Sequence, residues 1–178
     1  MKKILAFAGS NSSTSINHKL VSYVASQIAD HEVKTIRLTD YPLPIFSEDL
    51  EKESGYPERL KELLTEINRV EGVVISVNEH NGAASAFFKN VLDWLSRIEN
   101  KYLAGKKVLL MSASPGKRGA LSAYEYTKNV LPRYNAEVIS GFNFPSFHNN
   151  FSEEDQKIND PELSETVTKA VAIFLKAL

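Results

Sequence analysis

The sequence predicts a three-layer α/β sandwich, in which helices cover both faces of a five-stranded parallel sheet. Two observations predict this class: short apolar runs recur along the chain, and segments with the 3.6-residue period of amphipathic helices separate them. The length agrees, because 178 residues, 43% of them hydrophobic, are enough for one domain with a buried core. Residues 1–178 are therefore expected to form a single domain.

Five segments are expected to be strands. Three are nearly continuous apolar runs, as strands buried on both faces of a parallel sheet should be: residues 4–8, 73–77 and 108–111. Residues 32–38 and 137–139 are more polar, which favours edge positions. Because crossovers between parallel strands are right-handed, two strand orders are common, and 2-1-3-4-5 places both polar strands at edges.

Five amphipathic segments are expected to be the helices. They lie within residues 16–28, 60–67, 87–98, 119–131 and 161–178. The last has a clear start signal, with Asp160 as N-cap and Pro161 at the first helical position. Trp94 shares the apolar stripe of its helix, which favours the core or a subunit interface over contact with a ligand.

The composition excludes several classes of function. The chain has no cysteine, which removes disulfides, thiol catalysis and iron–sulfur clusters. The four histidines (His18, His31, His80 and His148) lack the spacing of metal ligands, so no metal site is expected. A formal net charge of -1 gives no general attraction for nucleic acid or an anionic membrane.

The N-terminal apolar run is short. Two lysines precede residues 4–8, and Gly9 and a hydroxyl-rich loop follow directly, whereas a signal peptide needs a longer apolar stretch and a cleavage site. No apolar stretch reaches membrane-spanning length. The protein is therefore expected to be cytoplasmic.

In this fold, ligands bind beyond the carboxyl ends of the strands, near the switch point between strands 1 and 3. The loop after the first strand, residues 9–17, carries five hydroxyl side chains and leads into a helix whose first amides and dipole favour an anion. It lacks the dinucleotide and Walker glycine patterns, which favours a single phosphomonoester, as in FMN. A capped turn without a ligand is the alternative. The residues expected to bind the cofactor are Ser10, Ser12, Ser15, Ile16 and Asn17.

The loop after the third strand, residues 78–85, is small and polar, so its backbone can approach a flat ligand closely. It is expected to hold one side of a planar ring system through Asn78, Glu79, His80 and Asn81. A solvated loop histidine is the alternative for His80.

The loop after the fourth strand, residues 112–119, is expected to face the polar edge of the same ring, where donors would stabilise negative charge on a reduced flavin. The residues concerned are Ser112, Ser114, Pro115, Gly116 and Gly119. Lys117 and Arg118 are candidates for the phosphate of an incoming NADPH, or are simply solvated charges.

Two further segments leave alternatives open. Lys89, Asn90 and Asp93 form either an ordinary polar helix face or a contact across a dimer interface. The segment 143–157, rich in Phe and Asn, either reaches a partner subunit or is a surface loop. Ser-His-Asp hydrolysis is not expected, because no G-x-S-x-G nucleophile elbow is present.

Taken together, the loops resemble those of the NADPH-dependent FMN reductase family, a flavodoxin-like group that includes quinone, chromate and azo reductases. The family's phosphate loop, G-S-x-R-x-x-S-x-N, is similar to residues 9–17, GSNSSTSIN. Its segment P-E-Y-N-G-S-x-P-G-x-L-K-N-x-x-D-W is similar to residues 78–94, NEHNGAASAFFKNVLDW. The loop 112–119, SASPGKRG, falls where the family contacts flavin. The chain departs from the family at Asn78 and His80, where Pro and Tyr are usual, and lacks the loop arginine near Ser12 or Ser13.

The resemblance implies a flavodoxin-like fold, FMN as cofactor and NADPH or NADH as co-substrate. Hydride would pass from NAD(P)H through FMN to a quinone, free flavin or similar small acceptor in a ping-pong sequence. No catalytic acid–base residue is expected, because the cofactor carries the chemistry. A homodimer or homotetramer is implied, with Phe147, His148 and Phe151 as a candidate subunit contact.

Two other functions remain open. One is an FMN electron carrier that does not oxidise NAD(P)H, although such carriers are typically very acidic and this chain has a net charge of -1. The other is a non-redox module that binds a phosphate ligand, which the departures at Asn78, His80 and Ser85 leave open.

Overall fold

The computed structural model describes residues 1–178 and contains one central sheet of five parallel strands. The strands are β1 (Lys3–Ala8), β2 (Glu32–Thr35), β3 (Gly72–Val77), β6 (Lys107–Ala113) and β7 (Glu137–Phe144). They are arranged in the order β2-β1-β3-β6-β7, and every neighbouring pair is parallel. This is the predicted 2-1-3-4-5 order, with the two polar strands at the edges.

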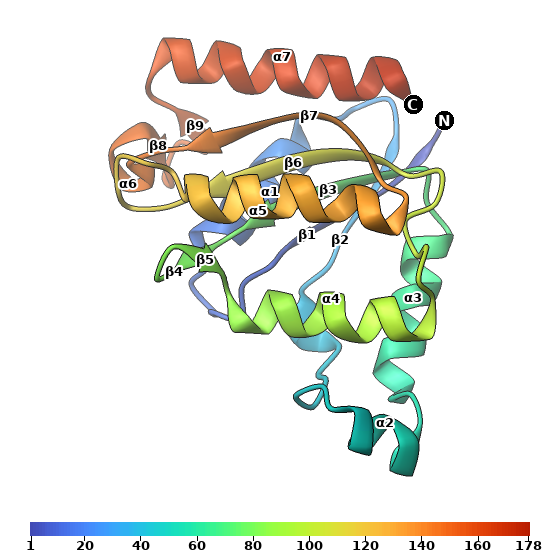
Figure 1. Cartoon of the computed structure of the whole chain (residues 1–178). Helices are drawn as coiled ribbons and strands as arrows, with labels where there is room; N and C mark the ends of the chain where they lie inside the picture. The colour runs from blue at the N-terminus through green and yellow to red at the C-terminus, as the bar shows by residue number, and fades with distance from the viewer.

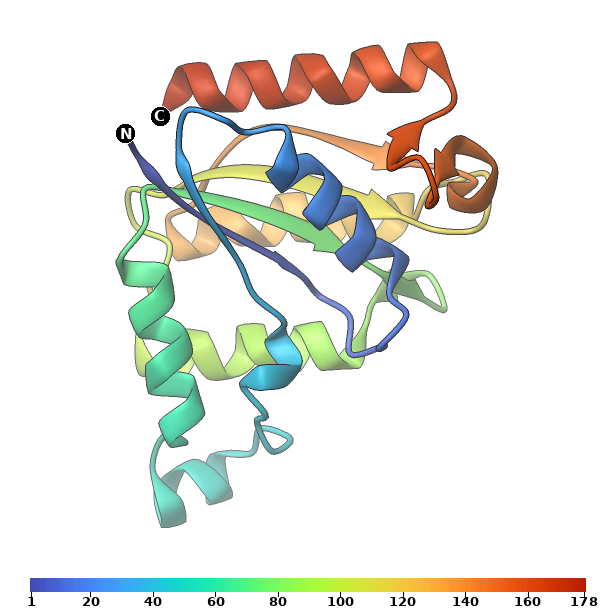
Figure 2. The ribbon, with the colours of Figure 1, turned by 180° about the vertical axis from the view of Figure 1, so that it is seen from behind.

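Helices cover both faces of the sheet, as expected (Figures 1 and 2). One face packs against α1 (Ile16–Ser26) and α7 (Pro161–Ala177), and the other against α3 (Glu58–Asn68), α4 (Ala86–Ile98) and α5 (Leu121–Val130). The short elements are η1 (Leu38–Asp40), α2 (Glu48–Ser54), η2 (Leu131–Tyr134), α6 (Phe147–Asn150) and two hairpins, β4 (Glu79–His80) with β5 (Ala83–Ala84) and β8 (Phe151–Ser152) with β9 (Lys157–Ile158).

The central strands show why their sequences are apolar throughout. In β1, Ile4 and Ala6 join the core beneath α1 and α7, whereas Leu5 and Phe7 join the core beneath α3 and α4. Since successive side chains of a strand point to opposite faces, a strand covered on both faces has no solvent-facing position to fill with polar residues. None of the helices combines the length and apolarity needed to cross a bilayer.

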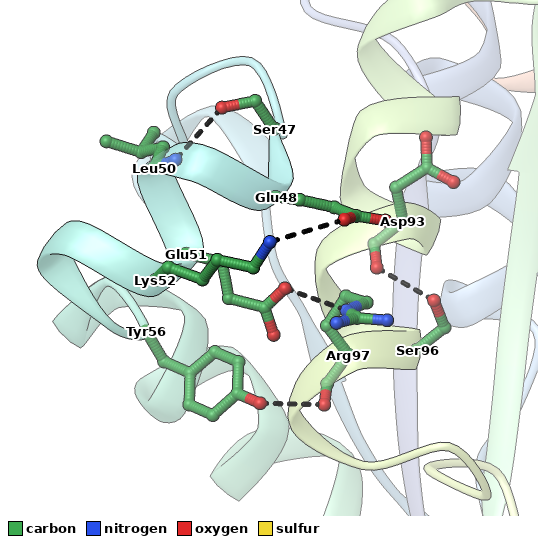
Figure 3. Close-up of polar contacts among 9 residues, drawn as sticks. All are labelled: Ser47, Glu48, Leu50, Glu51, Lys52, Tyr56, Asp93, Ser96 and Arg97. Atoms are coloured by element: carbon green, nitrogen blue, oxygen red, sulfur yellow. Dashed lines mark hydrogen bonds and ion pairs between the residues drawn. The ribbon is translucent and has the colours of Figure 1, made fainter.

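Helix α4 holds the segment around Pro44, just before α2, for which the sequence predicted no regular structure. The Pro44 carbonyl accepts hydrogen bonds from Asn90 Nδ2 (2.9 Å) and Trp94 Nε1 (2.8 Å). Figure 3 shows that α2 is fastened to the same helix, because Arg97 Nε donates to Glu51 (2.8 Å) and the Tyr56 hydroxyl donates to the Arg97 carbonyl (3.0 Å). Trp94 is fully buried, so its expected place in the core is confirmed.

The segment 143–157 is not the loop that was expected. Strand β7 continues to Phe144, and α6 and β8 follow. Phe147 and Phe151 are buried and stack with ring centroids 5.1 Å apart. The expectation that these two rings contact a partner subunit is therefore wrong, because they pack within the chain's own core. Only His148 of the expected trio is exposed.

Candidate cofactor site

A cavity of about 430 Å³ lies at the carboxyl ends of β1, β3 and β6, a volume typical of small-molecule sites. Figures 1 and 2 show the β4–β5 hairpin and α6 at this end of the sheet. The structure brings most of the predicted cofactor residues to this cavity. Those that line it are Ser10, Ser12, Ser15, Ile16, Asn17, Asn78, Glu79, His80, Ser114 and Pro115.

The loop between β1 and α1 is organised by its own hydroxyl groups. Ser15 caps α1, its Oγ accepting from the His18 amide (3.1 Å). Ser10 Oγ accepts from the Ser12 amide (3.2 Å), and Ser12 Oγ from the Thr14 amide (3.3 Å). Ser12 Oγ also lies 3.3 Å from Thr14 Oγ1, so one of these two hydroxyls donates to the other, and the remaining hydroxyls keep their O–H free to donate. This end of the cavity therefore presents hydroxyl donors on a fixed loop.

The first amides of α1 complete this donor set. The amides of Ile16 and Asn17 donate to no group of the protein, as is usual for the first turn of a helix. Unpaired amides, hydroxyls and the positive end of the helix dipole favour an anion of one phosphate group. The donors present therefore fit the phosphomonoester of FMN.

Asn17 contributes its backbone to the cavity, whereas its side chain bonds within the protein. It is 2% exposed, and its Nδ2 donates to the Ala113 carbonyl (3.0 Å). Its Oδ1 accepts from Ser76 Oγ (2.7 Å) and from the Ala113 amide (2.9 Å). Asn17 therefore ties the start of α1 to the ends of β3 and β6, and so fixes the three loops relative to one another.

The segment after β3 forms the β4–β5 hairpin rather than an open loop. Asn78 Nδ2 lies 3.1 Å from Nε2 of His80, so two of the residues that depart from the family pattern pair with each other. Glu79 accepts from the Ala123 amide (3.0 Å) and so caps α5, whose N-cap residue Ala120 offers no side-chain oxygen. Asn81 is at the hairpin turn with a positive φ and does not line the cavity.

The loop after β6 is held in place by residues that do not line the cavity. Ser112 is fully buried and its Oγ donates to the Gly119 carbonyl (2.7 Å). Gly119 has a φ of +58°, and a Cβ there would lie 2.9 Å from the Phe144 carbonyl carbon, so only glycine fits this position. These two residues and Gly116 do not line the cavity, whereas Ser114 and Pro115 do.

Lys117 and Arg118 are exposed on the same loop, and neither forms an ion pair. Sequence reasoning missed five lining residues: Asn11, Thr14, Lys19, Ala113 and His148. Asn11 and Thr14 lie within the predicted loop, and Lys19 lies one helical turn after Ser15. His148 was expected only at a subunit contact, and α6 carries it to the cavity from outside the three loops.

His18, next to Asn17 on α1, gives a pH-dependence prediction. Burial and the nearby Arg37 lower the pKa of His18, and Asp40 opposes them weakly. Below the ordinary value of 6.5 the unfolded chain therefore binds more protons than the folded chain, so stability falls as the pH falls through 6.5. Urea unfolding at pH 7 and pH 5 should show a larger loss for the wild type than for His18→Gln. Equal losses would contradict the assignment.

This chain resembles known proteins in sequence and in fold. The family model for NADPH-dependent FMN reductases matches residues 2–149. A quinone reductase of Escherichia coli K12 is 33% identical over 98 residues, which are 55% of this chain and 52% of the relative, so the match spans about half the length of that relative.

Two solved structures show the fold. The flavoenzyme NAD(P)H:(acceptor) oxidoreductase FerB of Paracoccus denitrificans superposes with a TM-score of 0.77 at 24% identity, covering 99% of this chain and 96% of that one. Oxidised flavodoxin 1 of Bacillus cereus superposes with a TM-score of 0.62 at 17% identity, covering 100% and 99%. The expected flavodoxin-like fold is confirmed. Because the family model matches most of this chain, residues 2–149, the chain belongs to the NADPH-dependent FMN reductase family.

Proposed function

We propose that the protein is an FMN-dependent oxidoreductase that uses NAD(P)H to reduce a quinone, free flavin or similar small acceptor. The observation that carries the proposal is the cavity at the ends of β1, β3 and β6, with its phosphate-type donor set, in a chain of this family. The family's name gives FMN as the flavin that is reduced and NADPH as the electron donor. Bound FMN supplies the redox chemistry, since its ring accepts a hydride from the donor and gives up electrons to the acceptor.

The chain's own residues bind and orient the cofactor. The amides of Ile16 and Asn17 and the hydroxyls of Ser12 and Thr14 would hold the phosphate. The pocket walls at Asn78–His80 and at Ser114–Pro115 would flank the rest of the cofactor. No residue is assigned an acid–base role, because hydride transfer between two stacked rings depends on their relative position.

The proposal also covers the electron acceptor and the order in which the substrates react. The relative named quinone reductase supports a small acceptor. A ping-pong sequence, in which the nucleotide leaves before the acceptor binds, is part of the proposal. A homodimer or homotetramer, a single domain and a cytoplasmic location stay predictions.

The first experiment is a visible spectrum of the purified protein after incubation with FMN and desalting. Under anaerobic conditions NADPH and then NADH are added. Retained yellow absorbance that bleaches with either nucleotide is the expected result. Retained flavin that stays yellow with both would favour an electron carrier. Protein that retains no flavin would favour the non-redox module and refute the proposal.

Lys117 and Arg118 are proposed to select NADPH over NADH. Both are exposed cations without an ion-pair partner, and the additional phosphate of NADPH is the group they would attract. The double change Lys117→Gln and Arg118→Gln should raise the KM for NADPH about tenfold and leave the KM for NADH unchanged. Lys128→Gln, an exposed charge at the end of α5, is the control. Parallel changes for both nucleotides would remove this role.

A further inference from the structure

Lys19 is the only lysine or arginine that lines the cavity. It lies on the first turn of α1, one turn beyond the Ser15 cap, on the side where the phosphate donors gather. Its Nζ forms an ion pair of 2.6 Å with Oε2 of Glu153. The side chains are 36% and 46% exposed, so the pair is open to solvent, and of the two residues only Lys19 lines the cavity.

Glu153 comes from a segment that is firmly packed against α1. It directly follows β8, in the turn that leads to β9. Phe151, just before it, stacks on Phe147 and meets the ring of Tyr23 edge to face, with centroids 5.3 Å apart. Tyr23 belongs to α1, so the ion pair and the aromatic contact join the same two elements. The segment also carries His148, which lines the cavity.

The charged groups at this end of the cavity are those of the Lys19–Glu153 pair. The loop itself offers only neutral donors, and the residues near Ser12, where the family has an arginine, are serines. A phosphate monoester carries up to two negative charges. Lys19 has three N–H donors, so it can hold Glu153 and still donate to a phosphate oxygen. Glu153 carries a negative charge near the same place, and its repulsion of the phosphate offsets part of the attraction by Lys19.

We propose that Lys19 is the cationic ligand of the cofactor phosphate and takes the place of the absent loop arginine, and that the negative charge of Glu153 limits the phosphate affinity that Lys19 provides. This inference rests on the proposed function. The cation makes the site selective for a phosphorylated flavin over the same flavin without phosphate. Glu153 sets that selectivity below the value that Lys19 alone would give.

The test compares two ligands, FMN and riboflavin, which differ only in the phosphate. Dissociation constants for both are measured by titrating flavin-free protein and following flavin fluorescence. The variants are Lys19→Gln, Lys19→Arg, Glu153→Gln and the double change Lys19→Gln with Glu153→Gln. The control is Lys34→Gln, which breaks an ion pair of the same 2.6 Å length between β2 and Glu66 on α3, away from the cavity.

The expected result is a change for FMN alone. Lys19→Gln should weaken FMN about tenfold and leave riboflavin unchanged, because only the phosphate loses a charged donor. Glu153→Gln should strengthen FMN about threefold, and Lys19→Arg should stay within about threefold of the wild type. In the double variant the gain from Glu153→Gln should persist, because the carboxylate repels the phosphate itself whether or not Lys19 is present, so FMN should bind more tightly than to Lys19→Gln alone. Lys34→Gln should change neither constant.

Other outcomes separate this inference from the proposed function. If Lys19→Gln weakens FMN and riboflavin equally, the pair only holds the 147–158 segment against α1, and the inference fails while FMN binding stands. If Glu153→Gln weakens FMN, its proposed limiting role fails. If the wild-type protein binds neither flavin, the proposed function fails and the inference fails with it.

Discussion

Replacing Asn17 by alanine is expected to weaken FMN binding at least about a hundredfold and to lower the free energy of unfolding by about 2–4 kcal/mol. The side chain makes three buried hydrogen bonds, two with the main chain of Ala113 and one with Ser76 Oγ. Without it, three buried polar groups lose their partner. The loops after β1, β3 and β6 would also lose the tie that fixes their spacing, and the proposed phosphate donors lie on the first of them.

Asn90 provides the matched control for this prediction. It is also a buried helical asparagine, and it also bonds main-chain groups, accepting from the Phe46 amide (2.8 Å) and donating to Pro44. Those contacts hold the segment before α2 and do not line the cavity. Asn90→Ala should therefore cost comparable stability in urea unfolding without changing the FMN dissociation constant of the folded protein. Equal losses of FMN affinity in both variants would show that general destabilisation, and not loop spacing, weakens binding.

The central sheet was predictable because its strands are covered on both faces. Residues 4–8 were expected as a strand, and β1 is Lys3–Ala8. The edge strand β7 was expected over 137–139, but it continues to Phe144. Its later residues include Ser140 and Gly141, which break the apolar run. Ser140 Oγ instead donates to the Ala170 carbonyl on α7 (2.7 Å), a tertiary contact that periodicity does not reveal.

Helix α2 was missed for a related reason. Its sequence, EDLEKES, has a single apolar residue and no amphipathic stripe. Its stability comes from the Ser47 cap and from contacts with α4 such as the Arg97–Glu51 ion pair, which join residues far apart in the sequence.

The site was predictable as a set of loops and less so residue by residue. The carboxyl ends of parallel strands meet at one edge, so the loops after β1, β3 and β6 had to converge there. Sequence does not tell a polar side chain that faces a ligand from one that braces a loop. Ser114 lines the cavity, whereas Ser112, two residues earlier, turns inward to Gly119. His148 reaches the cavity only through the packing of α6.

Phe147, at the start of α6, is the position at which a second substitution is expected to have a large effect on stability. Phe147→Ala should lower the free energy of unfolding by about 3–5 kcal/mol, the range for a large aromatic side chain removed from a core. The ring is fully buried between Phe144 and Phe151. The amide of Phe147 also donates to the Ser114 carbonyl (3.1 Å), so a displaced α6 would disturb both His148 and the loop after β6. Flavin affinity should therefore fall as well.

Phe174→Ala on α7 separates these two effects. Phe174 is equally buried in the same core cluster, but α7 carries no residue that lines the cavity, so its loss should cost similar stability in urea and leave the FMN affinity of the folded protein intact. Both variants are compared by urea unfolding, by FMN titration and by their size in solution. If Phe147→Ala kept its stability and instead dissociated an oligomer, the ring would lie at a subunit contact and the core position of α6 would be refuted. A loss of stability with unchanged assembly would instead place α6 among the elements that support the flavin cavity from within one chain.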